Sequence, residues 1–100
     1  MAYVIKIVAT KPANVAWFKD SSPTAPQTIA NMVEWDLAAP GRLSSMLVPI
    51  DADNYEATII FDNAIHGDEW LSAKNTQPDW VLHDTYFTAH NIVTTVTIFP

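Results

Sequence analysis

Cysteine is absent from the 100 residues, and glycine occurs only twice. Without cysteine the chain can form no disulfide, no thiolate metal site and no cysteine nucleophile. The two glycines, Gly41 and Gly67, lie far apart in the sequence, whereas phosphate-binding and dinucleotide-binding loops need clustered glycines. Any chemistry must therefore come from other side chains and other architectures.

Basic residues are also scarce: five Lys and Arg stand against eleven Asp and Glu, which gives a net charge of −6. The five bases are scattered and form no run, whereas nucleic-acid binding requires a basic footprint on the protein surface. The same balance of charge disfavours binding to anionic membrane surfaces. We therefore predict no nucleic-acid partner and no membrane partner.

Targeting and membrane-spanning patterns are missing as well. The first residues lack a basic region followed by a long apolar run, so they do not resemble a secretory signal. The uncharged stretch over residues 85–100 is too short and too rich in threonine for a membrane helix. We expect the protein to act where it is made, in the cytoplasm or in a virion.

What the chain does contain is apolar material, 49% of its residues, with eleven per cent aromatic. Its periodicity predicts strands over residues 2–10, 42–50, 54–62 and 92–99, and helices over residues 28–38, 63–74 and 78–90. This β-α-β-β-α-β order, with the last helical region in two pieces, predicts one ferredoxin-like α+β domain over residues 1–100. Such a domain has a four-stranded antiparallel sheet with helices on one face.

One face of this sheet would carry no helix, yet several of the predicted strands are apolar on both faces. The sequence leaves open which set of alternating residues faces the helices. An exposed apolar face predicts a partner, most simply a second copy of the chain, so we expect a homodimer or larger homo-oligomer. Met46, Ile60 and Phe99 are candidates for that interface. The adjacent rings of Trp17 and Phe18 are a second candidate anchor, because aromatic residues dominate interface hot spots; the alternative places one of them in the core.

The three histidines are the candidates for chemistry. His83 and His90 are seven residues apart and would share one face of a continuous helix. A metal site there would need a carboxylate such as Asp84 or Glu69, whereas surface or capping roles need none, and we predict neither metal nor cofactor. His66 precedes Gly67 and fits a loop. In an enzyme, His83 would be the best general base, because histidine titrates near neutral pH.

Three local patterns, together with the order of elements, resemble the dimeric α+β barrel superfamily, especially antibiotic-biosynthesis-monooxygenase-like domains. The resemblance spans nearly the whole chain. The patterns are the apolar strand 2–10, the helix end Trp35-Asp36-Leu37 followed by Pro40-Gly41-Arg42-Leu43-Ser44, and the hairpin leading to Asp62 and then Glu69-Trp70-Leu71.

The resemblance implies a dimer in which two four-stranded sheets face each other and form one barrel. It also implies one of three kinds of protein: a small cofactor-free oxygenase, a haem-degrading enzyme, or a protein without known catalysis. Haem degradation is disfavoured, since only Trp70 matches the Asn, Trp and His that this branch requires. The first strand has no Asn, and His83 lies beyond the break at Pro78.

Two functions follow as alternatives. The first is a non-catalytic, self-associating structural or binding module, of the kind found among virion or phage proteins. The second is a small cofactor-independent monooxygenase acting on a hydrophobic aromatic molecule, with Trp70 and Tyr86 lining the pocket and His83 as the base. A cavity of several hundred cubic ångströms that holds His83 would favour the enzyme. A barrel filled by Met46, Ile60 and Phe99 would favour the structural module, which is the function we predict first.

Overall fold

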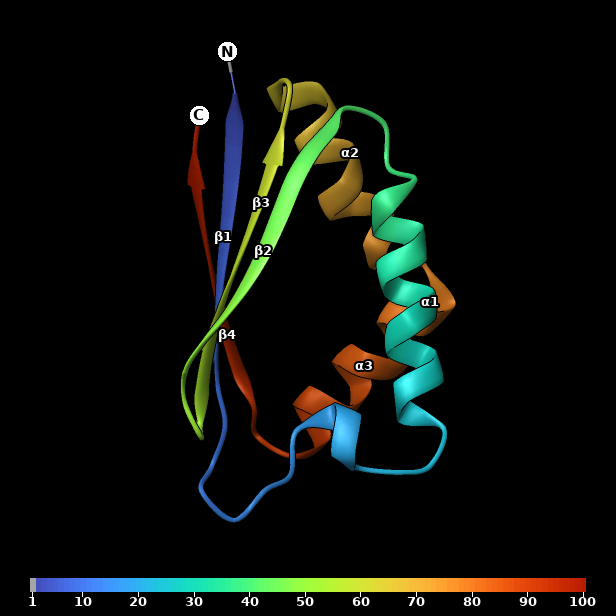
Figure 1. The fold of residues 1–100 in the computed structure, drawn as a ribbon, viewed down its shortest axis with the longest axis vertical. Helices are drawn as coiled ribbons and strands as arrows, with labels where there is room; N and C mark the ends of the chain where they lie inside the picture. Colours follow the sequence, from blue (N-terminus) through green and yellow to red (C-terminus); the bar gives the residue numbers. More distant parts are fainter. Residues whose placement is uncertain (1) are drawn as a thin grey trace.

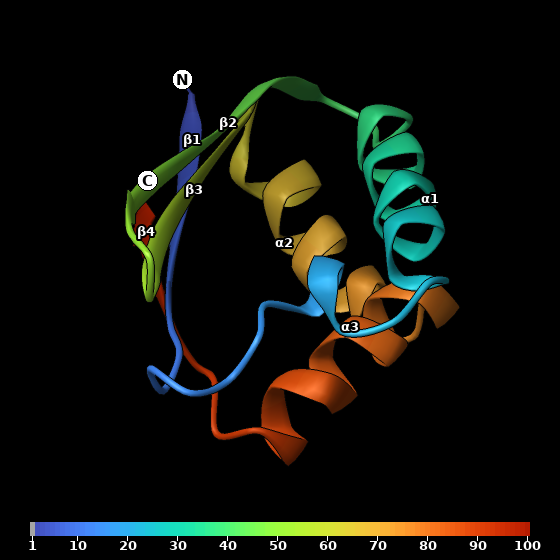
Figure 2. The same ribbon diagram turned by 60° about the horizontal axis from the view of Figure 1, so that its bottom comes forward.

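The computed structural model describes residues 2–100, in which one antiparallel sheet and a layer of helices face each other (Figure 1). The sheet has the strand order β2-β3-β1-β4. Figure 2 shows all three α-helices on the same side of it. The elements in chain order are β1 (Tyr3–Thr10), the short 3-10 helix η1 (Phe18–Asp20), α1 (Ala25–Leu37), β2 (Arg42–Asp51), β3 (Asn54–Phe61), α2 (Ala64–Lys74), α3 (Pro78–Ala89) and β4 (Val93–Phe99). The predicted ferredoxin-like arrangement is confirmed.

Local chemistry sets where the helices begin. The Asn63 side chain accepts a hydrogen bond from the backbone N–H of His66 (3.0 Å) and thereby caps α2. The Gln77 side chain accepts from the backbone N–H of Trp80 (2.8 Å) at the start of α3, where Pro78 occupies the first turn. Helix α1 begins at Ala25, three residues earlier than predicted, because a proline again fits its first turn. Each helix therefore starts at a residue suited to that position.

The strand register determines which residues face the helices. Ile5 on β1 lies opposite Ile59 on β3 and Ile98 on β4, so these side chains share one face. Ile5 and Ile59 are buried there beneath the helices. We call the filled part of this face the closed core; it consists of Tyr3, Ile5, Ile59, Phe61 and Trp70. Helix α2 is the helix that packs on β1 and β3 over this core.

The other face of the sheet, which we call the open face, carries no helix (Figure 2). Lys6 and Glu56 form an ion pair across its middle (2.7 Å). The register places seven apolar residues on this face: Val4, Val8, Met46, Val48, Ile60, Val93 and Phe99. The interface candidates Met46, Ile60 and Phe99 therefore share one surface, and the alternation left open by the sequence is resolved.

Several apolar side chains of the helices are exposed. In α1, Met32 is buried, whereas Val33 and Leu37, which share an apolar stripe with it, are exposed. Ile65 on α2 and Val81 on α3 are exposed as well. The physical reason is that α1 packs against α3 and η1 rather than flat on the sheet, so its apolar side does not meet a continuous surface.

Candidate functional site

A cavity of about 670 Å³ lies between the sheet and the helices. Its walls come from the helix-facing sides of all four strands, from α1 and α3, from the end of α2 and from the η1 segment. Most of the lining side chains are apolar or aromatic, and a few polar ones are interspersed. A largely apolar cavity with a few convergent polar groups is the usual form of a small-molecule site.

Five rings form one wall of the cavity, which we call the aromatic wall: Trp17, Phe18, Tyr55, His83 and Phe87. The ring centroids of Trp17 and Tyr55 are 4.8 Å apart, and those of His83 and Phe87 are 4.1 Å apart. Phe18 meets His83 edge-on at 5.3 Å. Phe87 is buried, and the other four rings are partly buried.

His83 lies within the aromatic wall, and its side chain is 12% exposed. Its Nδ1 atom is 3.1 Å from the Asp84 carboxylate. This contact favours the tautomer that carries its proton on Nδ1 and leaves the Nε2 lone pair available. The other Asp84 oxygen is 3.7 Å from the Lys74 ammonium, which holds the carboxylate from the opposite side. The arrangement is suited to a general base facing an apolar cavity.

Asp36 on α1 supplies a second polar group to the cavity. One of its carboxylate oxygens accepts hydrogen bonds from the indole N–H groups of Trp70 (2.9 Å) and Trp80 (3.1 Å). Burial raises the pKa of the Asp36 carboxyl, although the two indole hydrogen bonds act to lower it. The two tryptophan rings meet edge-on at 5.8 Å. Asp36 therefore fixes the orientation of two rings that line the cavity.

Tyr55 comes from the helix-facing side of β3 and belongs to the aromatic wall. Burial, with a smaller contribution from the charge of Asp84, raises the pKa of the Tyr55 hydroxyl to about 12. The phenol therefore stays protonated at neutral pH. Within residues 2–100 its hydroxyl forms no hydrogen bond, in contrast to the hydroxyl of Tyr3, which donates to Asp68 (2.7 Å).

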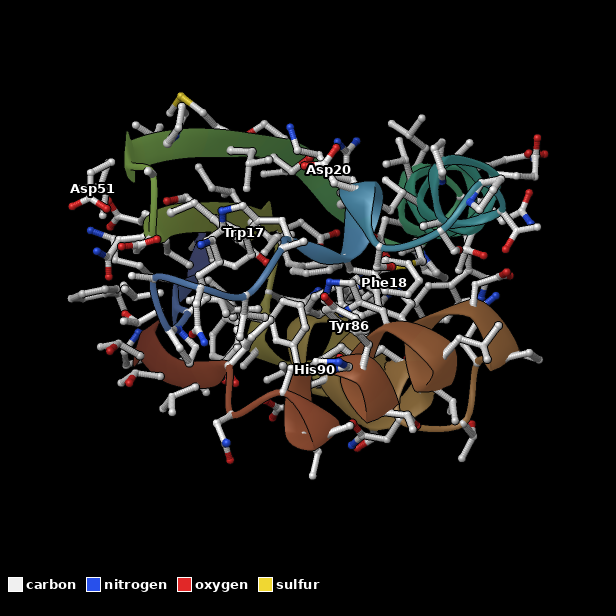
Figure 3. All side chains as sticks on the ribbon, turned by 90° about the horizontal axis from the view of Figure 1, so that it is seen from below. Trp17, Phe18, Asp20, Asp51, Tyr86 and His90 are labelled. Carbon is white, nitrogen blue, oxygen red and sulfur yellow. The ribbon has the colours of Figure 1, made fainter. Side chains whose placement is uncertain are left out.

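Of the three residues predicted for the pocket, two line the cavity in the structure and one does not. Trp70 and His83 both line the cavity. Tyr86 lies outside it: its hydroxyl donates to the Ala16 carbonyl (2.6 Å), and its ring stacks on the exposed ring of His90 with centroids 4.0 Å apart. Figure 3 shows Tyr86 and His90 together on the α3 side. Tyr86 thus anchors the segment before η1, and its predicted place in the pocket is corrected.

Trp17 and Phe18 lie between the sheet and α3 (Figure 3). The Trp17 indole N–H donates to the Ala52 carbonyl in the turn between β2 and β3 (2.9 Å), and both rings pack around Phe87 and Tyr86. Both rings are engaged within the chain and line the cavity, and their place at an interface with another copy stays a prediction.

The remaining histidines have local roles. His66 pairs with Asp62 (2.6 Å) beside the turn at Gly41, and His90 lies at the end of α3. Among residues 2–100, no three His, Asp or Glu side chains gather closely enough to hold a metal ion. Nor is any helix in that range long and apolar enough to cross a membrane.

Sequence reasoning missed two groups in the site, Asp36 and Tyr55. Asp36 was noted only as part of a helix end, and nothing in the sequence shows that two distant indoles converge on it. Tyr55 was correctly placed on one face of a strand with Ala57, Ile59 and Phe61. That face contains both the closed core and the cavity, and the alternation of a strand cannot separate the two.

Known structures share this fold across nearly the whole chain. SnoaB from Streptomyces nogalater, described as a cofactor-independent oxygenase, is similar with a TM-score of 0.67 and 15% identity, over 99% of this chain and 91% of that one. A Deinococcus radiodurans protein provisionally described as an antibiotic biosynthesis monooxygenase has a TM-score of 0.64 and 10% identity, over 98% of this chain and 90% of that one. A dimeric ferredoxin-like protein of unknown function from Thermobifida fusca has a TM-score of 0.53 and 12% identity, over 97% of this chain and 90% of that one.

No protein-family model matches the sequence, and no curated protein matches it. The resemblance to antibiotic-biosynthesis-monooxygenase-like domains is confirmed at the level of the fold. The function predicted first, a non-catalytic structural module, is wrong in the light of these comparisons, because similar structures are described as a cofactor-independent oxygenase and, provisionally, as an antibiotic biosynthesis monooxygenase. The cavity that holds His83 agrees with this correction.

Proposed function

We propose that the chain is a small cofactor-independent oxygenase that binds a hydrophobic aromatic molecule in the cavity between the sheet and the helices. The observation that carries the proposal is the apolar cavity of about 670 Å³ with a partly buried, carboxylate-paired His83 in its aromatic wall. The likeness in fold to SnoaB supports the reaction class.

The reaction requires two things from the protein, a general base and a cavity that excludes water. The Nε2 atom of His83 removes a proton from an activated methylene carbon of the substrate, and Asp84 stabilises the resulting imidazolium. The electron-rich carbanion reduces dioxygen and forms a carbon–oxygen bond. Loss of water then leaves a ketone, so one oxygen atom enters the substrate and the other leaves with the two methylene hydrogens. The substrate supplies the electrons, and no external reductant is needed.

Oxygen consumption tests this function. The native chain should consume dioxygen with polycyclic aromatic ketones that carry an activated methylene group, and isotopically labelled dioxygen should place one labelled oxygen in the product. His83→Gln should lower kcat by about 10²–10⁴-fold, the usual contribution of a general base. His90→Gln is the matched control, because His90 is exposed and lies outside the cavity. Equal activity of both variants would contradict the role of His83.

We also propose that two copies associate through the open face of the sheet. Seven apolar residues share this face, and no helix within residues 2–100 covers them; a surface of this kind usually marks an interaction site. The similar protein from Thermobifida fusca is described as dimeric. Burying the open face against its own copy would leave the cavity on the helix side of each sheet.

Native mass spectrometry of two matched variants tests the dimer. Phe99→Lys places a charge on the open face, where the Phe99 side chain is 48% exposed, and should shift a dimer toward monomer. Leu37→Lys changes a similarly exposed apolar residue, 58% exposed, on α1 away from that face and should leave the mass of the assembly at that of a dimer. A native chain that is monomeric, or a dimer that is insensitive to Phe99→Lys, would contradict the proposed interface.

A further inference from the structure

The Tyr55 hydroxyl is a polar group of the cavity that the proposed reaction does not use. It comes from β3, whereas His83 and Asp84 come from α3. Ring contacts connect the two elements through the aromatic wall: Trp17 meets Tyr55 at 4.8 Å and Phe87 at 6.3 Å, and Phe87 meets His83 at 4.1 Å. A planar molecule lying along this wall would meet both Tyr55 and His83.

Other polar groups of the cavity already have partners in the chain. Both Asp36 and Asp84 bind donors from other helices. The Asn54 side chain donates to Asp51 (2.8 Å) and accepts from Thr10 (2.7 Å). Within residues 2–100 the Tyr55 hydroxyl has no such partner, and it is not among the fully buried polar atoms. A hydroxyl that is accessible and unpaired within the chain is available to donate a hydrogen bond to a molecule bound in the cavity.

We infer that Tyr55 determines specificity by donating a hydrogen bond to an oxygen atom on the aromatic ligand, which selects oxygen-bearing rings over plain hydrocarbons. The ligand class is a planar aromatic molecule with a hydroxyl or carbonyl oxygen at its edge. This inference rests on the proposed function for the location of the ligand, but it does not require turnover. Because the pKa of Tyr55 is about 12, its hydroxyl remains a donor across the pH range in which His83 can act as a base.

A matched pair of ligands and a matched pair of variants test the inference. 1-Naphthol and 1-methylnaphthalene have the same ring and nearly the same shape, but only the first carries an oxygen. Their binding is measured by displacement of the environment-sensitive dye Nile red from the native chain, from Tyr55→Phe and from Tyr86→Phe. Tyr86→Phe removes a hydroxyl that donates to the Ala16 carbonyl outside the cavity, so it controls for the loss of a phenol elsewhere.

The native chain should bind 1-naphthol more tightly than 1-methylnaphthalene. Tyr55→Phe should lower the affinity for 1-naphthol about fivefold, which corresponds to the loss of one net hydrogen bond, and should leave the affinity for 1-methylnaphthalene unchanged. Tyr86→Phe should change neither affinity. If both ligands bind but Tyr55→Phe weakens them equally or not at all, the role of Tyr55 is overturned while the cavity survives. If neither ligand binds the native chain, the cavity proposed for the function is wrong, and the role of Tyr55 fails with it.

Discussion

The closed core and the aromatic wall lie on the same side of the sheet, and both contain large aromatic rings. In the closed core the rings of Phe61 and Trp70 meet at 5.9 Å, and neither is more than 4% exposed. In the aromatic wall the rings of Trp17, Phe18 and Tyr55 remain partly exposed toward the cavity.

The difference comes from which helix lies above each part. Helix α2 packs directly on β1 and β3 over the closed core, whereas α1 packs on α3 and η1 and leaves space above the strands. Filled space contributes to stability, because every apolar surface has a partner. Unfilled space leaves aromatic surface for a ligand. Substitutions in the closed core should therefore change stability, and those in the aromatic wall should change binding.

The largest expected effect is that of Phe61→Ala. Phe61 is fully buried, and removal of its ring should lower the free energy of unfolding by about 3–5 kcal/mol. Phe18→Ala, in the partly exposed aromatic wall, should lower the free energy of unfolding by less than half as much as Phe61→Ala does. Urea denaturation of both variants measures the comparison. Equal losses would mean that the aromatic wall is as tightly packed as the closed core.

A smaller loss of stability is expected from Gly67→Ala, which adds a methyl group where the closed core has no space for it. A Cβ atom at Gly67 would lie 2.3 Å from the Tyr3 ring, so α2 or the ring must move. Overpacking of this kind costs about 1–3 kcal/mol. Tyr3→Leu in the Gly67→Ala background should restore part of the loss, because the shorter side chain makes room. Thermal unfolding of the two single variants and the double variant gives the coupling, and strict additivity would show that the two residues do not meet.

The smallest effect is expected from Asp36→Asn and appears as a dependence on pH. Burial raises the folded-state pKa of Asp36 above the ordinary 3.8, so the folded chain holds this proton more tightly than the unfolded chain does. The native protein therefore loses stability as the pH rises above about 4, and the asparagine variant does not share this loss. The amide oxygen that the substitution introduces can still accept from both indoles. The melting temperature of the variant relative to native should be higher at pH 7 than at pH 4; a constant or inverted difference would contradict the burial of a charged Asp36.

Much of the fold could be predicted from the sequence, because local rules decide it. The alternation of Tyr55, Ala57, Ile59 and Phe61 predicts their shared face. Pro49 cannot donate to a sheet ladder, which predicts an edge strand or a bulge, and β2 is an edge strand whose register shifts between Pro49 and Asp51. The packing of the helices was harder to predict. The stripe of Val33 and Leu37 looks inward-facing on α1 alone, but whether it is buried depends on how α1 lies relative to α3.

The site was predicted in part. His83 was selected because histidine is the usual base, and Trp70 because of the resemblance; both line the cavity. Tyr86 was misplaced because helical periodicity does not reveal that its hydroxyl reaches the Ala16 carbonyl far away in the sequence. Asp36 and Tyr55 were missed because their roles depend on residues that are distant in the sequence. Asp36 accepts hydrogen bonds from the indoles of Trp70 and Trp80, and Tyr55 lines a cavity formed by several elements.

The most direct test of the cavity as a ligand site is an NMR titration of the native chain with 1-naphthol, followed through the indole N–H signals of its four tryptophans. Trp17, Trp70 and Trp80 line the cavity, whereas Trp35 packs against the closed core without lining it. The signals of the first three should shift with one common dissociation constant, and that of Trp35 should stay in place. A titration that leaves Trp17, Trp70 and Trp80 unmoved, or that moves Trp35 alone, would contradict the account.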